Sequence, residues 1–463
     1  MQYDVIVVGG GSGGCAAAIR CTDLGMKVAL IEKRRKGGIG GTCINRGCIP
    51  TKVLMKSMNV LDEIRDSSKF GIEVEGYKVD FKKIMAKKDK IMKQMAFGLG
   101  AFVLKPRGIE IIYGDALLKD RNTVAVKDGD ADTEYTGKYI VVATGSEPLE
   151  IPVFKIDRKN VITSDEALTL QEVPETMLII GAGPIGIELG MFYSSMGCET
   201  TIVEMMDCAA PLLKDAELSA IVEKALKKKG IKVLVGTGVE GIRVIEDGKV
   251  ESSLSNGEKT VTEKVLVSIG RKKNTDSIGM EAVGIEMERG LICVDETLKT
   301  NIDNIYAVGD IVSGPQLSHK AQFDGAVVAE NINGNRMAVD YRSIPWAIFS
   351  EPEVAKVGLS KAEAQAEGIN VLEGTLKMAA NEKASCMQST EGMIKIAVDA
   401  DTRKIIGSSI VAHDASTLIG EMALAVKNGI TIEEFNLTVH AHPTLNEALF
   451  EAGKSVTGKG YHK

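Results

Sequence analysis

Two cysteines with four residues between them stand in the run GGTCINRGCIPTK, residues 40–52. In a regular helix the Cα atoms of Cys43 and Cys48 would lie about 8 to 9 Å apart, which is beyond disulfide reach. A bridge between them needs a distorted turn, and Gly47 permits one. Pro50 suits the first turn of a helix, so we expect Cys48 near a positive helix end that stabilises a thiolate. A zinc pair and unrelated buried thiols are the other interpretations of these two residues.

A second group that could do chemistry lies in the run HAHPTLNE, residues 440–447. His442 is followed by Glu447 after five residues. An imidazole is the commonest general base near neutral pH, and a carboxylate can orient it. Alone the pair is a weak signal, because a single histidine near a terminus is usually structural or exposed.

Two copies of one glycine motif predict the elements that carry nucleotide cofactors. Each copy follows an apolar run, has the spacing GxGxxG, and precedes an acid 23 residues after its first glycine. Glycines let the backbone turn sharply and approach a pyrophosphate, while the acid accepts hydrogen bonds from a ribose. One copy is weak evidence, but two copies predict two dinucleotide-binding folds. The residues are Gly9, Gly11, Gly14 and Glu32 in the first copy, and Gly181, Gly183, Gly186 and Glu204 in the second.

The residues after Glu204 bear on cofactor choice. They are Met205, Met206 and Asp207, with no arginine to bind a 2'-phosphate. NAD is therefore favoured over NADP.

Composition sets the class of the protein. A chain of 463 residues predicts two to four domains, and 49 glycines with only 11 prolines favour an α/β fold. The net charge of -7 argues against a nucleic-acid partner. The sequence has no apolar run of roughly 20 residues and no signal peptide, so we expect a cytoplasmic protein without a membrane partner. Eight cysteines are too sparse for a disulfide scaffold.

The pattern changes after about residue 340. Strand-like runs such as residues 393–398 precede an apolar-periodic helix at about residues 416–427, which predicts an α+β C-terminal domain. The lysine-rich residues 82–93 keep apolar residues at helical spacing, which predicts an amphipathic helix with a solvated charged face. Residues 222–229 have the same pattern.

The cysteine run resembles the redox-active disulfide signature of the pyridine-nucleotide disulfide oxidoreductases. The resemblance covers essentially the whole chain, since residues 142–145 and 300–310 resemble the family's other two flavin-domain motifs. It implies an α/β protein with two Rossmann-like FAD- and NAD-binding domains and an α+β dimerisation domain. The implied parts are 1–145 and 273–340 for FAD, 146–272 for NAD, and 341–463 for the interface.

The resemblance also implies a role for particular residues. Cys43 and Cys48 would form the redox disulfide, with Cys48 facing the flavin. His442 would be the base and Glu447 the acid that orients it. Lys52 and Glu188 would form an ion pair beside the flavin, although Glu188 could also be a solvated helix acid. Asp310 would bind the FAD ribitol, and Gly270 and Arg271 would lie near the nicotinamide nucleotide. Other implied FAD contacts are Thr42, Thr144, Gly145 and Ala321, and no metal is expected.

Within the family the chain is most similar to the dihydrolipoamide dehydrogenases. Residues 440–449 resemble theirs, and Pro184 stands where glutathione reductases usually have tyrosine. The final residues, GKGYHK, have no cysteine, unlike mercuric and large thioredoxin reductases. The implied reaction is oxidation of dihydrolipoamide with reduction of NAD through the disulfide and FAD. Another disulfide or metal-ion reductase and a non-catalytic flavoprotein are the alternatives.

The implied partners follow from that reaction. They are a lipoyl-carrier protein of a 2-oxoacid dehydrogenase or glycine-cleavage system, and a second copy of the chain. The two copies would share each active site. Two departures bear on substrate choice: residues 34–40 form a longer, more glycine-rich segment than usual, and Arg46 stands where many members have valine.

Overall fold

The computed structural model describes residues 2–34, 38–276 and 278–460. Part of the unusual segment (35–37) and the last three residues of the sequence therefore lie outside the described residues. The chain divides into two compact units. The first contains residues 1–53, 82–149 and 270–341, and the second contains residues 54–81, 150–269 and 342–463.

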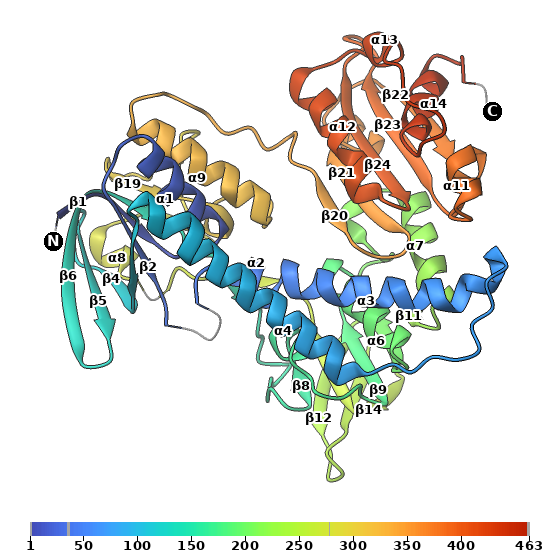
Figure 1. Cartoon of the computed structure of the whole chain (residues 1–463), viewed down its shortest axis with the longest axis horizontal. Helices are drawn as coiled ribbons and strands as arrows, with labels where there is room; N and C mark the ends of the chain where they lie inside the picture. The colour runs from blue at the N-terminus through green and yellow to red at the C-terminus, as the bar shows by residue number, and fades with distance from the viewer. Residues whose placement is uncertain (1, 35–37, 277, 461–463) are drawn as a thin grey trace. The chain divides into compact units, whose positions relative to one another are not determined.

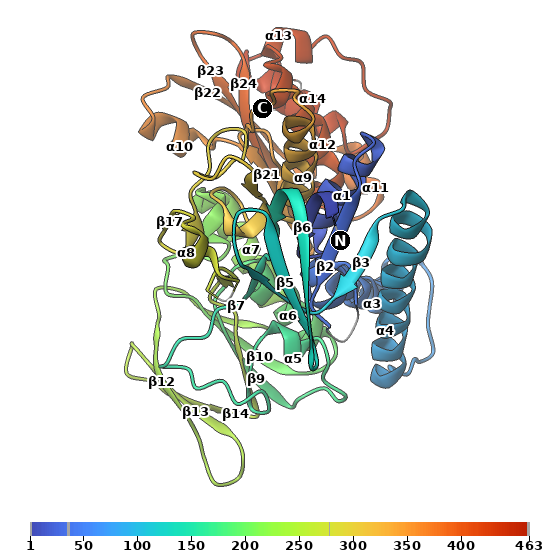
Figure 2. The same cartoon turned by 90° about the vertical axis from the view of Figure 1, so that its left-hand side faces the viewer.

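A mostly parallel sheet forms the centre of the first unit. Its order is β3-β2-β1-β6-β5-β4, and β19 also pairs with β6. Residues 5–8 of β1 are buried, as expected for a parallel strand covered on both faces. The β5–β6 pair is antiparallel and is visible in Figure 2. The strands are β1 (Gln2–Val8), β2 (Val28–Glu32), β3 (Glu110–Tyr113), β4 (Asp115–Leu118), β5 (Thr123–Asp128), β6 (Ala131–Val142) and β19 (Ile305–Ala307).

Two helices of the first unit, α1 (Ser12–Asp23) and α9 (Ser318–Ile332), pack side by side (Figure 1). A Cβ at Gly325 would lie 2.3 Å from the Gly13 carbonyl oxygen, so glycine is needed at this crossing. The remaining elements are α2 (Gly41–Arg46), α4 (Phe81–Gly98), α8 (Met280–Val283), and the pairs β7 (Ser146–Pro148) with β16 (Arg271–Lys273) and β17 (Met287–Glu288) with β18 (Leu291–Ile292). Helix α3 (Cys48–Asp66) begins in the first unit and continues into the second.

The lysine-rich helix α4 confirms the predicted amphipathic helix, with one difference. Five of the six lysines between residues 82 and 93 are exposed, but Lys88 is only 1% exposed. Lys88 lies three residues after the buried Met85, so it falls on the apolar face. Its ammonium group makes an ion pair with Asp89 at 2.9 Å.

The second unit contains another parallel sheet, with order β11-β10-β9-β15-β8. Its strands are β8 (Val161–Ile162), β9 (Thr176–Ile180), β10 (Glu199–Val203), β11 (Lys232–Leu234) and β15 (Lys264–Val267). The helices are α5 (Ser164–Ala167), α6 (Pro184–Ser195) and α7 (Ala216–Lys228). An antiparallel sheet is formed by β12 (Val239–Val244), β13 (Val250–Leu254) and β14 (Lys259–Thr262).

The C-terminal part of the second unit is an antiparallel sheet with helices. Its order is β20-β21-β24-β23-β22. The strands are β20 (Trp346–Ile348), β21 (Glu353–Gly358), β22 (Val371–Lys377), β23 (Met393–Asp399) and β24 (Ile405–Ala412). The helices are α10 (Lys361–Ala366), α11 (Glu382–Cys386), α12 (Ala415–Asn428), α13 (Ile432–Phe435) and α14 (Glu447–Val456). The predicted fold class, two Rossmann-like sheets followed by an α+β part, is confirmed.

In the part of the chain that the structure describes, no helix combines the length and the apolar character needed to cross a membrane.

Candidate active site

The two cysteines lie on either side of a break between helices. Helix α2 ends at Arg46, Gly47 has φ −146° and ψ −106°, and α3 begins at Cys48. The Gly47 carbonyl oxygen accepts hydrogen bonds from the Thr51 amide (3.2 Å) and hydroxyl (2.7 Å). The predicted break at Gly47 and the helix start at Cys48 are therefore present.

The Cys43 and Cys48 thiols contact each other directly, and both are free thiols in this structure. The pKa of Cys43 is lowered to about 6, first because the Cys48 thiol donates a hydrogen bond to it. The Ser318 and Ser12 hydroxyls and the Lys52 charge lower that pKa further. The pKa of Cys48 is raised, first because its proton is held in the hydrogen bond to Cys43, and the packing of neighbouring atoms around the sulfur and the charge of Cys43 add to this.

These hydroxyl groups bear on which sulfur carries the charge of the reduced pair. The hydroxyls of Ser12, at the start of α1, and Ser318, at the start of α9, lie 2.6 Å apart and both act on Cys43. The two sulfurs share one proton, so they titrate as a unit. The donors favour a Cys43 thiolate, whereas the family resemblance places the thiolate on Cys48.

Both glycine turns have the same construction. The Glu32 carboxylate accepts a hydrogen bond from the Gly10 amide at 2.5 Å, and the Glu204 carboxylate accepts one from the Ala182 amide at 2.7 Å. Glu204 also accepts from the Met206 amide at 2.9 Å. In each copy, therefore, the acid at the end of the second strand holds the turn after the first strand.

Asp310 belongs to a chain of hydrogen bonds within the first unit. Its Oδ2 accepts from the Ser146 hydroxyl at 2.5 Å. The Arg271 guanidinium in turn donates to the Ser146 hydroxyl (2.7 Å) and carbonyl oxygen (2.6 Å). Arg271 is predicted to lie near the nicotinamide nucleotide, and these hydrogen bonds connect it through Ser146 to Asp310, the carboxylate expected to bind FAD. The neighbouring Thr144 hydroxyl donates to the Asn274 carbonyl oxygen at 2.7 Å, which ties the same two segments together.

A buried ion pair next to Asp310 was not predicted from the sequence. Lys320 and Asp324 are completely buried and lie 2.8 Å apart in α9. Asp324 accepts from the Gly309 amide (2.9 Å) and the Tyr341 hydroxyl (2.9 Å), and Lys320 donates to the Gly309 carbonyl oxygen (3.0 Å). The pair therefore fixes the backbone just before Asp310. Its i,i+4 spacing on a helix was the available sequence signal.

The predicted base and acid are in contact in the second unit. His442 Nδ1 lies 3.0 Å from Glu447 Oε1, and Glu447 Oε2 accepts from the Thr444 amide at 2.8 Å. The hydrogen bond to Glu447 raises the pKa of His442. The imidazole side chain is 63% exposed, so this surface presents it for contact with another molecule.

His440 has a different role from His442. Its Nε2 lies 2.7 Å from Glu421 Oε1, and Glu421 Oε2 accepts from the Asn446 side-chain amide at 3.0 Å. Glu421 of α12 thus holds both ends of the loop that carries His442. These contacts give His440 a structural role.

Other predicted site residues lie in separate units. Lys52 and the two cysteines belong to the first unit. Glu188 and His442 belong to the second. Glu188 is buried, not solvated, and accepts a hydrogen bond from the Phe349 amide at 3.0 Å. The Lys52–Glu188 ion pair stays a prediction.

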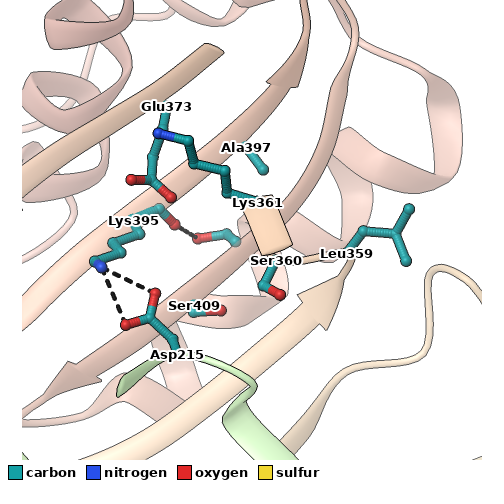
Figure 3. Close-up of a pocket in the computed structure, with 9 residues that line it drawn as sticks. Asp215, Leu359, Ser360, Lys361, Glu373, Lys395, Ala397 and Ser409 are labelled. Atoms are coloured by element: carbon teal, nitrogen blue, oxygen red, sulfur yellow. Dashed lines mark hydrogen bonds and ion pairs between the residues drawn. The ribbon is translucent and has the colours of Figure 1, made fainter. Parts of the chain in front are cut away.

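A small pocket of the second unit is separate from these groups (Figure 3). It is lined by residues that include Asp215, Ser360, Glu373 and Lys395. The Lys395 ammonium group binds both oxygens of Asp215, at 3.0 and 2.9 Å. Asp215 also caps α7 by accepting from the Leu218 amide. This ion pair therefore connects the C-terminal sheet to the second nucleotide-binding fold.

The described ranges 2–34, 38–276 and 278–460 contain no group of three or more His, Cys, Asp or Glu side chains that could hold a metal ion.

Comparison with known proteins decides the family. Residues 3–325 match the model of the pyridine nucleotide-disulphide oxidoreductases, and residues 344–452 match the dimerisation domain of that family. The chain belongs to this family. It is therefore an oxidoreductase that uses FAD and NAD, and its dimerisation domain supports a homodimer.

Full-length relatives are dihydrolipoyl dehydrogenases. The chain is 42% identical to the enzyme of Geobacillus stearothermophilus over all of this chain and 98% of the relative. It is 38% identical to one from Bacillus subtilis with the same coverage. Among solved structures, the HOCl-induced flavoprotein disulfide reductase RclA of Escherichia coli, as a Cu(II) complex, is similar with TM-score 0.87 and 26% identity over 98% and 100% of the two chains. LpdA of Mycobacterium tuberculosis shares the fold, with TM-score 0.90, 24% identity, and 98% and 99% coverage.

The two glycine turns fit the cofactors of this oxidoreductase family. A Cβ at Gly14 would lie 1.8 Å from the Gly9 carbonyl oxygen, and one at Gly186 would lie 2.0 Å from that of Gly181, so the turns themselves require these glycines. By contrast, a Cβ at Gly183 would meet nothing within 4 Å.

The space at Gly183 is the kind that a pyrophosphate occupies at a helix start. A Cβ at Gly11 would likewise meet only the Gly41 Cα atom, at 3.9 Å. The protein's own packing therefore does not require glycine at the middle position of either motif. The space that the missing side chain leaves is open to a cofactor phosphate.

Ser318→Ala tests which of the two sulfurs carries the negative charge of the reduced pair. Loss of one hydrogen bond to a charged sulfur should raise the apparent pKa of Cys43 from about 6 by about one unit. The pH dependence of iodoacetamide alkylation of the reduced enzyme, read at each cysteine by mass spectrometry, measures it. Ser194→Ala, whose hydroxyl donates to the Lys229 carbonyl oxygen in the second unit, is the control. The prediction would be contradicted if Cys48, and not Cys43, were alkylated with an apparent pKa near 6 and Ser318→Ala left that pKa unchanged.

The Arg271–Ser146–Asp310 chain can be tested with Ser146→Ala. Without the hydroxyl, Asp310 loses a hydrogen-bond donor and Arg271 an acceptor, so FAD should dissociate with a Kd raised about tenfold. Flavin fluorescence after dilution measures the release, and Ser194→Ala again serves as the control. An unchanged FAD affinity would show that this chain of bonds does not position Asp310.

Proposed function

We propose that this chain is a dihydrolipoamide dehydrogenase, which oxidises dihydrolipoamide to lipoamide and reduces NAD+. The observation that carries the proposal is the direct contact of Cys43 and Cys48 across a helix break, because such a pair can form and break a disulfide. The exposed His442 imidazole, held by Glu447, supplies the base. The 42% identity to a dihydrolipoyl dehydrogenase supports this substrate within the family.

The proposed reaction begins with the Cys43–Cys48 disulfide. His442 accepts a proton from one thiol of dihydrolipoamide, and that sulfur attacks Cys43 as the Cys43–Cys48 bond breaks. The second substrate thiol then displaces Cys43, which releases lipoamide and leaves the enzyme pair reduced by two electrons. NAD+ receives these electrons as hydride, and the remaining proton leaves to solvent. Bound FAD supplies the two-electron transfer between the cysteine pair and the nicotinamide.

The remaining residues hold the reacting groups. Glu447 fixes the orientation of the His442 imidazole and stabilises its charged form. Lys52 stabilises the thiolate of the pair by its charge and is proposed to pair with Glu188 beside the flavin. Glu204 binds the NAD ribose, where a 2'-phosphate would meet like-charge repulsion.

The partners and division of the chain follow from this reaction. We propose a lipoyl-carrier protein as substrate carrier, from a 2-oxoacid dehydrogenase or a glycine-cleavage system, and the cytoplasm as location. The division into FAD (1–145 and 273–340), NAD (146–272) and interface (341–463) domains stays a proposal.

We also propose that each active site is shared between two chains. The surface that carries His442 also exposes apolar side chains just before it, since Leu437 is 82% and Val439 is 93% exposed. Exposed apolar groups beside a catalytic histidine are expected where a second copy covers them. The cysteine pair of one chain would then face His442 of the other.

A second candidate function is reduction of another disulfide or a metal ion. The observation that favours it is the structural similarity to RclA, solved as a Cu(II) complex. Arg46, between the two cysteines, is the residue of this chain that could change substrate choice.

A substrate panel tests the proposed function. The FAD-loaded enzyme should reduce NAD+ with dihydrolipoamide, and with NADP+ kcat/KM should fall at least about tenfold because of Glu204. In the reverse direction, NADH oxidation should be fastest with lipoamide. Glutathione disulfide, coenzyme A disulfide, Hg(II) and Cu(II) complete the panel. Faster turnover of any of these four, or equal use of NADP+, would reject the corresponding part of the proposal.

A mixed dimer tests the shared site. A Cys48→Ser chain paired with a His442→Gln chain should contain one doubly damaged site and one intact site. Such dimers, separated by two affinity tags, should recover up to about half of the wild-type activity, while either mutant homodimer stays nearly inactive. If the histidine acted within its own chain, both sites of the mixed dimer would be damaged and no activity would return.

A further inference from the structure

A second carboxylate lies beside the proposed base. Glu382 is the first residue of α11, and its Oε2 lies 3.7 Å from His442 Nδ1, the same nitrogen that contacts Glu447. Glu382 is about two-thirds exposed, at 69% of its side chain. It is too distant to form the main hydrogen bond but close enough to act by charge.

The position of Glu382 is built into the fold. The Asn381 side chain accepts a hydrogen bond from the Ala384 amide at 2.8 Å, which caps α11. Its amide nitrogen donates to the Thr444 carbonyl oxygen at 3.1 Å, in the loop that carries His442. One side chain therefore starts α11 and ties it to that loop, and this places Glu382 next to the imidazole.

The charged groups around His442 come from two helices. Glu447 of α14 and Glu382 of α11 are the described groups that act on its charge, and both favour the imidazolium. The nearby His440 imidazole acts on Glu447 and is itself held by Glu421. In the proposed shared site, the cysteine pair and Arg46 of the second chain would also face His442, but they are the same in every variant compared below.

We propose that Glu382 is a positioning residue for the reaction, which together with Glu447 stabilises the protonated form of His442. This inference rests on the proposed role of His442 as the base. Glu447 orients the ring through a direct hydrogen bond, and Glu382 adds negative charge on the same side. The imidazolium forms when the base takes the substrate proton, so both carboxylates stabilise the product of that step.

Glu382→Gln keeps the size of the side chain and removes its charge, so it tests the proposal. His442 must be neutral to accept a proton, so kcat/KM for dihydrolipoamide decreases as the pH drops below the pKa of His442. Glu382→Gln should move this acid limb to lower pH by about half a unit, the size expected for an exposed pair at this distance. The variant should then be faster than wild type on the acid side and slightly slower on the alkaline plateau. General damage would instead lower activity at every pH without moving the limb.

Matched variants make the comparison specific. Glu367→Gln removes an exposed charge at the end of α10 that is not among the groups acting on His442, and it should leave the limb in place. Glu382→Asp keeps the charge on a shorter side chain, so its acid limb should lie between those of Glu382→Gln and the wild type. At about 1 M salt the wild-type and Glu382→Gln limbs should converge, because the Debye length is then about 3 Å.

A measurement that needs no substrate separates this inference from the proposed function. The NMR titration of the His442 ring proton in the FAD-loaded dimer, assigned by its loss in His442→Gln, should show the same half-unit decrease in Glu382→Gln. An identical His442 pKa in Glu382→Gln and wild type would overturn the role of Glu382, even if lipoamide turns over. If the His442 pKa shifts but the enzyme does not turn over lipoamide, the role of Glu382 is retained and the proposed substrate is rejected.

Discussion

In both nucleotide-binding folds, the carboxylate at the end of the second strand holds the turn that follows the first. Glu32 and Glu204 accept hydrogen bonds from the Gly10 and Ala182 amides. This contact fixes the start of the next helix, where a cofactor pyrophosphate is stabilised by free backbone amides. In the first fold, the same helix start carries Ser12, whose hydroxyl acts on Cys43. The geometry of the cofactor turn and the charge of the cysteine pair therefore depend on the same few residues.

The first unit gathers its site from segments far apart in the chain. Ser12 and Ser318 come together because α1 and α9 cross closely at Gly325 and Gly13. The loop before Asp310 is held by the Lys320–Asp324 pair, whose complete burial is tolerated because each charge has several partners. A buried pair of this kind adds little to the free energy of unfolding, but it fixes the backbone that it binds. That is what a loop expected to bind a cofactor requires.

Local patterns in the sequence predicted most of the fold and the local geometry around the proposed reacting groups. The glycine turns, the break at Gly47 and the acid after His442 are short-range features, so spacing alone revealed them. Contacts between distant segments were not predictable in this way. Arg271 lies 125 residues from Ser146, and its partner could be found only once β7 and β16 were paired. Lys88 was expected in solvent, but the turn of α4 places it on the apolar face. Glu382 is 60 residues from His442 and carries no motif of its own.

The electrostatic shifts at the cysteine pair and at His442, the two parts of the proposed site, are complementary. The hydrogen bond from Cys48, the two serine hydroxyls and Lys52 lower the pKa of Cys43, while Glu447 and Glu382 raise that of His442. One shift favours a Cys43 thiolate and the other an imidazolium, so both stabilise the state in which His442 is protonated and the second substrate thiol has displaced Cys43 as a thiolate. Each shift is produced by neighbours within its own unit. The proposed dimer would therefore bring together two groups whose charges are already set, and association would mainly have to supply their distance and orientation.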